Sequence, residues 1–222
     1  MKSVLKALPV AALFLLVTGC AADSGSSGSG EKTEQVTVTA VNAQGAPQDG
    51  WTVSPDPAGQ VDCSAGTPSD SATTAGVYSC DPVAMHANVC WKGADARTLL
   101  CAEDPFTPTL RTMTTTVDLP AVGKPDKAQP WAVQLDDGTQ CVLRHGGGWG
   151  VGADQAMPVY GCLGAGNEDL AVLQGASDAS AVDTSKDAWT VKVGKVGSAD
   201  AQLPAPTVKN VSKAYFAAAA GQ

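Results

Sequence analysis

Two histidines, His86 and His145, limit the chemistry that this chain could perform. Nucleophilic catalysis of the Ser-His-Asp or Cys-His kind needs a histidine beside the nucleophile. His145 lies between Arg144 and three glycines, His86 follows Met85, and neither position belongs to a recognisable catalytic motif. We therefore predict no catalytic residues and no cofactor, and we expect His145 to be a loop residue that could contact a ligand.

Two acidic pairs, Asp136-Asp137 and Glu168-Asp169, carry the carboxylates that calcium binding or glycoside hydrolysis would need. Both pairs lie in sequences typical of turns, since Asp-Asp-Gly is a hairpin sequence and Gly166-Asn167 precedes the second pair. The C-x-x-C and H-E-x-x-H spacings that would indicate zinc do not occur. We predict turns at these positions and no metal site.

The N-terminus has the pattern of an export signal. Lys2 and Lys6 precede an apolar run from Ala7 to Val17 that is too short to span a bilayer as a finished helix. The run closes on Val17-Thr18-Gly19-Cys20, which resembles the bacterial lipobox, whereas an ordinary secretory cleavage site prefers A-x-A. The resemblance implies a signal peptide at 1–19 and a diacylglyceryl group on the thiol of Cys20.

The residues that follow Cys20 are almost all Ala, Ser and Gly, which predicts a flexible tether. We expect 20–34 to comprise the lipidated cysteine and this tether, so that the protein is held on the outer face of the cell membrane. The chain is acidic, with 14 basic and 22 acidic residues. This charge argues against nucleic acid as a partner and makes the lipid, not electrostatics, the membrane anchor.

Six further cysteines indicate a disulfide framework, because an even number in an exported chain favours pairing. Their connectivity is not fixed by the sequence. Sequential β-strands tend to lie side by side, so we expect neighbouring cysteines to pair, as Cys63 with Cys80, Cys90 with Cys101 and Cys141 with Cys162.

Five tryptophans are present, and Trp149 differs from the others because glycines flank it on both sides. Trp91, Trp131 and Trp189 lie in strand-like runs and are expected in the core. We predict that Gly146 to Gly152 is a loop at the end of a hairpin and that Trp149 is either a lid over the hairpin core or an exposed contact. Trp149 and His145 are the binding residues that the sequence suggests.

Alternating apolar and polar residues predict strands throughout, and the clearest hairpin is Trp131 to Leu135, an Asp136-Asp137-Gly138 turn, and Thr139 to His145. Thr107 to Leu119 is expected as an exposed or edge strand. Asn210 to Ala220 suggests either a helix or a fraying tail. Other strands are expected at Gln35 to Val41, Trp51 to Ser54, Gly76 to Cys80, Asn88 to Lys92, Thr98 to Cys101, Pro158 to Leu163, Leu170 to Gln174 and Trp189 to Val193.

These elements predict a mostly β protein. An N-terminal β module at 35–119, a proline-bounded linker at 120–130 and a C-terminal β module at 131–222 would follow the tether. Two small disulfide-stapled antiparallel modules of sandwich type and one continuous two-lobed sandwich are both compatible with the pattern.

From Tyr78 to Tyr215 the chain resembles a group of actinobacterial exported proteins. The residues that carry the resemblance are Tyr78-Ser79-Cys80, Cys90-Trp91, Leu99-Leu100-Cys101, Asp104-Pro105, Leu110-Arg111, Pro130-Trp131, Asp137-Gly138, Cys141, Gly147-Gly148-Trp149, Tyr160-Gly161-Cys162 and Trp189-Thr190-Val191. The absence of isoleucine fits a high-GC genome. The resemblance implies a place in the cell envelope and no particular activity.

The function that these observations favour is that of a non-catalytic envelope lipoprotein that binds or scaffolds an extracytoplasmic protein or glycan. Two alternatives remain open. One is an extracytoplasmic hydrolase with a carboxylate-based site, which would need two acidic groups in one cleft. The other is a protease-inhibitor-like module, which would display a rigid loop bordered by disulfides.

Overall fold

A computed structural model describes residues 30–56, 59–164 and 166–221 of the chain. The predicted signal peptide, Cys20 and residues 21–29 of the predicted tether lie outside these residues. Within the described part, no helix is long and apolar enough to cross a bilayer.

The fold is mostly β, as the sequence predicts, and its strands form two sheets. The smaller sheet has the order β2-β7-β6-β5-β4, with β3 also beside β7. Its strands are β2 (Thr52–Val53), β3 (Gly59–Gln60), β4 (Val77–Tyr78), β5 (Cys90–Lys92), β6 (Thr98–Ala102) and β7 (Thr109–Thr114). We refer to this sheet and its loops as the smaller lobe.

The larger sheet has the order β1-β14-β8-β9-β10-β11-β13-β12, and β13 also pairs with β14. This extra pairing closes the sheet on itself. Its strands are β1 (Glu34–Val38), β8 (Ala132–Leu135), β9 (Gln140–Leu143), β10 (Met157–Cys162), β11 (Leu170–Gln174), β12 (Val182–Asp183), β13 (Thr190–Lys195) and β14 (Thr207–Ala217). We refer to it as the larger lobe. Two short 3-10 turns, η1 (Val83–Met85) and η2 (Ala153–Gln155), complete the described elements.

The hairpin expected near residue 136 is confirmed, because β8 pairs antiparallel with β9. The amide of Thr139 donates to the Asp137 carboxylate at 3.0 Å. Gly138 has a φ of 86°, a conformation that glycine adopts without a steric penalty. The turn chemistry therefore fixes the register of this hairpin, whose far end carries the candidate site.

The C-terminal expectation of a helix or a fraying tail is wrong, because Thr207–Ala217 is the long strand β14. It pairs with β13, β8 and β1 along its length. Val211, Ala214 and Phe216 are buried within the larger sheet. Three partner strands and this burial outweigh the high helix propensity of the alanines.

Two other strands lie elsewhere than expected. β7 lies between β6 and the pair β2 and β3, so it is an inner strand and not an exposed edge. Leu110 and Met113 on β7 are fully buried, which accounts for this position. β1, expected to open the N-terminal module, pairs in parallel with β14 of the larger sheet.

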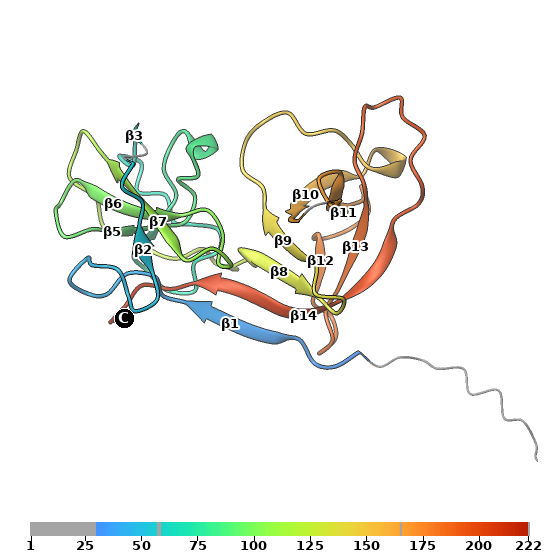
Figure 1. Ribbon diagram of the computed structural model, residues 1–222, viewed down its shortest axis with the longest axis horizontal. Helices are drawn as coiled ribbons and strands as arrows, with labels where there is room; N and C mark the ends of the chain where they lie inside the picture. The colour runs from blue at the N-terminus through green and yellow to red at the C-terminus, as the bar shows by residue number, and fades with distance from the viewer. Residues whose placement is uncertain (1–29, 57–58, 165, 222) are drawn as a thin grey trace, which may run out of the picture.

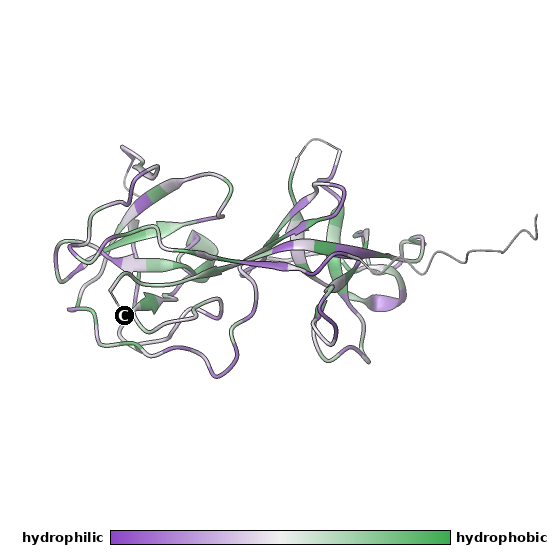
Figure 2. Ribbon diagram, turned by 90° about the horizontal axis from the view of Figure 1, so that it is seen from below, coloured by the Kyte–Doolittle hydropathy of each residue, from purple (hydrophilic) through white to green (hydrophobic). Residues whose placement is uncertain are grey.

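β14 joins the two lobes. With β1 beside it, the strand runs from the larger lobe to the smaller one, where the C-terminus lies (Figure 1). Viewed from below, extended strands form a narrow waist between the lobes (Figure 2). At the smaller lobe, the indole nitrogen of Trp91 donates to the Ala218 carbonyl at 2.8 Å.

A shared core also spans the junction. Trp91 of β5 packs edge-on against Trp131, which precedes β8, with ring centroids 6.2 Å apart. Ala217 of β14 belongs to the same buried cluster. This cluster therefore joins residues of both lobes at the junction, and both tryptophans are core residues as the sequence predicts.

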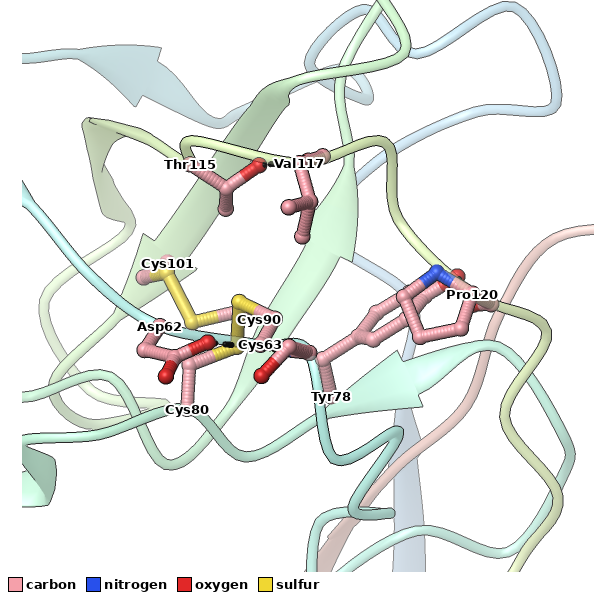
Figure 3. The surroundings of a disulfide bond; sticks show 10 residues. Asp62, Cys63, Tyr78, Cys80, Cys90, Cys101, Thr115, Val117 and Pro120 are labelled. Carbon is pink, nitrogen blue, oxygen red and sulfur yellow. Dashed lines mark hydrogen bonds between the residues drawn. A yellow bond between two sulfur atoms is a disulfide. The ribbon is translucent and has the colours of Figure 1, made fainter.

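All three expected disulfides are present: Cys63–Cys80, Cys90–Cys101 and Cys141–Cys162. The last two join residues directly opposite each other on adjacent strands. The first two lie in one buried cluster of the smaller lobe with Tyr78 (Figure 3). Such bonds persist in oxidising compartments, which fits an extracytoplasmic protein.

Candidate functional site

A pocket of about 210 Å³ lies where the two lobes meet. The smaller lobe contributes Val83 and His86, from η1 and its C-cap, together with Asn88 and Glu103. The larger lobe contributes the end of β9 and the loop that follows, with Arg144, His145 and Trp149. The structure thus places the two binding residues suggested by the sequence, His145 and Trp149, in one pocket. We call it the inter-lobe pocket.

The side chain of Arg144 lies between a glycine and an indole ring. A Cβ atom on Gly161 of β10 would lie 2.8 Å from the Arg144 Nε atom, so the guanidinium occupies the space that a side chain at position 161 would fill. On the other side, Cζ of Arg144 lies 3.1 Å from the centre of the Trp149 ring. This stacking is a cation–π contact, for which the planar guanidinium is well suited.

The hydrogen-bonding capacity of Arg144 is not satisfied by the protein. Its Nη1 atom is buried and has no hydrogen-bond partner in the described structure. Burial also lowers the pKa of Arg144 from its ordinary value. Because guanidinium remains charged at any physiological pH, the site presents a partly desolvated cation with an unused donor.

His145, next to Arg144, also has a buried nitrogen without a partner in the described structure and a pKa that burial lowers. Its Nε2 atom is also buried without a hydrogen-bond partner. Burial lowers the pKa of His145, the charge of Asp70 acts in the opposite direction, and His86 lowers the pKa further. The imidazole is therefore neutral near pH 7 and can offer either a donor or an acceptor at Nε2.

The opposite wall of the pocket carries a histidine beside a carboxylate. The His86 Nδ1 and Glu103 Oε1 atoms are 3.5 Å apart, and about half of each side chain is exposed. The backbone of Glu103 is fixed by the Trp131 indole, which donates to its carbonyl at 3.2 Å. Glu103 thus directs its carboxylate to His86, and no ion pair joins it to Arg144 in the described structure.

Trp149 is 49% exposed, so it is neither a fully packed lid nor a free contact. Its indole nitrogen donates to the Gly146 carbonyl, which folds the loop back on itself. Gly146 and Gly147 have φ values of 66° and 81°, which this tight loop requires. The ring covers the Arg144 guanidinium, and about half of the side chain remains exposed at the surface.

The acidic pairs serve local structure. Two hydrogen bonds from Thr139 lower the pKa of Asp137 to about 2, with a smaller effect from Lys209. Asp136 accepts a hydrogen bond from the Asn210 amide at 3.1 Å. In the second pair, Asp169 is bonded to Lys195 at 2.8 Å. Across the described residues, no group of three or more His, Cys, Asp or Glu side chains could hold a metal ion.

A second, larger hollow of about 570 Å³ lies on the larger lobe beside Trp189. Trp189 was expected in the core, but it is only partly buried and packs on the edge of the core cluster. Sequence reasoning missed this hollow, because the residues that line it come from segments far apart in the chain. Sequence reasoning also missed Glu103 and Asn88 in the inter-lobe pocket, for the same reason. The only sequence features that indicated this pocket were Arg144-His145 and the glycines around Trp149.

Comparison with known proteins finds no family model, no curated protein and no solved structure that matches this chain. The function must therefore be argued from the geometry of the site.

Proposed function

We propose that this protein is a non-catalytic binding protein of the cell envelope, anchored by lipid on Cys20, which holds an anionic group of its partner in the inter-lobe pocket. The anchor rests on the lipobox-like sequence that closes on Cys20. The three disulfides support the placement outside the cytoplasm. The resemblance to actinobacterial exported proteins supports the same placement.

One observation carries the binding role. Arg144 Nη1 and His145 Nε2 are buried, lack partners and belong to side chains that line the same pocket. A buried polar atom without a hydrogen bond costs about 1–3 kcal/mol, and more for a charged group. Folded proteins rarely retain such atoms without a reason, and a carboxylate or phosphate oxygen would supply charge-assisted hydrogen bonds to both side chains.

The carboxylate arrangement favours binding over hydrolysis. Among the described residues, Glu103 is the acidic side chain that lines the inter-lobe pocket, and Asp70 is the one that lines the larger hollow. A glycosidase of the usual kind needs two carboxylates in one cleft. The geometry therefore supports a ligand site better than the hydrolase alternative.

The experiment is site-specific photo-crosslinking in cells. A photoreactive amino acid replaces Leu163, which lines the inter-lobe pocket and is 40% exposed. A control chain carries the same probe in place of Val208, which is 67% exposed on β14. We expect an adduct from position 163 that is absent from position 208 and is lost when Arg144→Gln is added. Equal adducts from both positions, or an adduct from position 163 that persists with Arg144→Gln, would contradict the proposal.

A further inference from the structure

The larger hollow has walls from several elements of the larger lobe. β1 contributes Gln35 and Thr37, β14 contributes Phe216, and the segment from 179 to 184 forms another wall. The linker contributes residues 127–130, held in place by the Gln129 amide, which donates to the Asp70 carbonyl at 2.9 Å. The volume of about 570 Å³ lies within the usual range for small-molecule sites. We call this hollow the Trp189 groove.

The lining of the Trp189 groove is rich in neutral hydrogen-bonding side chains. The Thr73 hydroxyl and the Gln174 amide of the lining donate to backbone carbonyls. Within the described structure, the side chains of Gln35, Thr37 and Gln129 make no hydrogen bond to the protein. They therefore keep their amide and hydroxyl groups for a ligand. The charged side chains in the lining are Asp70 and Lys127, which are of opposite sign. The groove thus offers these three neutral side chains as donors and acceptors, and it has little net charge.

Trp189 provides a rigid aromatic wall. Its ring packs perpendicular to that of Phe216, with centroids 6.5 Å apart. Its backbone amide donates to the Thr33 hydroxyl at 2.8 Å, and its carbonyl accepts from the Val211 amide at 2.9 Å. The indole N–H makes no hydrogen bond within the described structure, so it too is available. An aromatic face with a free polar edge suits a ligand that has both C–H faces and hydroxyl groups.

From these features we propose that the Trp189 groove is a second binding site, which takes a neutral saccharide. A sugar ring stacks its C–H face on Trp189 while its hydroxyls bond to Gln35, Thr37 and Gln129. Because the chain is strongly acidic, a neutral glycan is also favoured over a polyanionic one. This site is separate from the inter-lobe pocket and does not depend on the function proposed for it.

The test uses the intact lipidated chain in a detergent without a sugar headgroup, titrated calorimetrically with soluble oligosaccharides. The probes are oligomers of N-acetylglucosamine, of neutral hexoses and of neutral pentoses, with a polyuronate as the anionic comparison. We expect at least one neutral oligomer to bind, Trp189→Ala to weaken it about tenfold or more, and Trp149→Ala to leave it unchanged.

Trp189 packs against Phe216, so its truncation also risks lowering stability. The double variant Gln35→Ala/Thr37→Ala changes two exposed side chains of β1 and provides the independent test. We expect it to weaken oligosaccharide binding with an unchanged melting temperature. The proposal is overturned if no neutral oligomer binds, if the polyuronate alone binds, or if the folded double variant binds as tightly as the native chain.

Discussion

The guanidinium of Arg144 lies against the indole of Trp149, with Cζ 3.1 Å from the ring centre, and this contact covers a cation that has an unpaired buried donor. The ring is half exposed, so the contact forms part of the surface of the molecule. Trp149 therefore has two roles in the proposed site: it orients Arg144, and it offers an aromatic face beside it.

Replacing Trp149 with alanine should separate binding from stability. An exposed cation–π contact is worth about 0.5–1 kcal/mol, so the free energy of unfolding should fall by no more than about 1 kcal/mol. The adduct formed by the probe at position 163 should nevertheless be strongly reduced, because an aromatic anchor is lost. Thermal melting and quantitative crosslinking measure the two effects. A large drop in stability with an unchanged adduct would instead make Trp149 a packed lid.

Gly161→Ala should disturb the site through Arg144 alone. The new Cβ would lie 2.8 Å from Nε at the far end of a flexible side chain, so the guanidinium can move and the strand can remain. We expect nearly unchanged melting and loss of the crosslinked adduct, as for Arg144→Gln. Gly148→Ala is the matched control, because a Cβ there would meet nothing within 4 Å. If Gly161→Ala and Gly148→Ala give the same amount of adduct, the position of the Arg144 guanidinium against Gly161 does not matter for binding.

The stability of the fold should depend on the protonation of His145. Burial lowers its pKa in the folded state below the ordinary value of 6.5, so the unfolded chain binds its proton more readily. Stability should therefore be fully present above about pH 6.5 and fall as the pH is lowered through and below that value.

This slope can be assigned to one residue. Denaturant titrations between pH 7.5 and pH 5 should show a loss of stability that His145→Gln abolishes. The aspartates with lowered pKa values act below their ordinary 3.8, outside this window. An identical slope in His145→Gln would mean that another group is responsible.

Much of the fold could be predicted from the sequence because its signals are local. The hairpin at 131–145 contains its own turn residues, and cysteines on successive strands pair with their neighbours. β14 was not predictable in this way, because its alanine-rich end favours helix until three other strands and the core around Trp91 are in place.

The candidate site was only partly predictable for a related reason. His145 and Trp149 lie close in sequence and in space, but His86 and Glu103 reach the pocket only because the lobes pack together. Trp189 resembles a core tryptophan in its strand-like context, and only the position of β1 and the linker around it creates a groove. Sequence periodicity reports which face of a strand is buried, but not which distant segment lies above it.

The proposed membrane anchor is tested by Cys20→Ser. The thiol is the expected acceptor of the diacylglyceryl group, so this variant should lose partition into the detergent phase while a folded chain with all three disulfides is retained. Two-phase detergent extraction followed by immunoblotting makes the measurement. Unchanged partition of the variant into detergent would reject lipidation at Cys20.

The most direct measurement is a titration of the intact chain with acetate and with inorganic phosphate, monitored by the NMR signals of the Arg144 Nε–H and the Trp149 indole N–H. Chloride at matched ionic strength serves as the control for screening. If Arg144 and His145 bind an anionic group, one of the two anions should shift both signals in a saturable way, leave the Trp189 indole unchanged and lose its effect in Arg144→Gln. The absence of any saturable shift, or an equal response to chloride, would contradict the account.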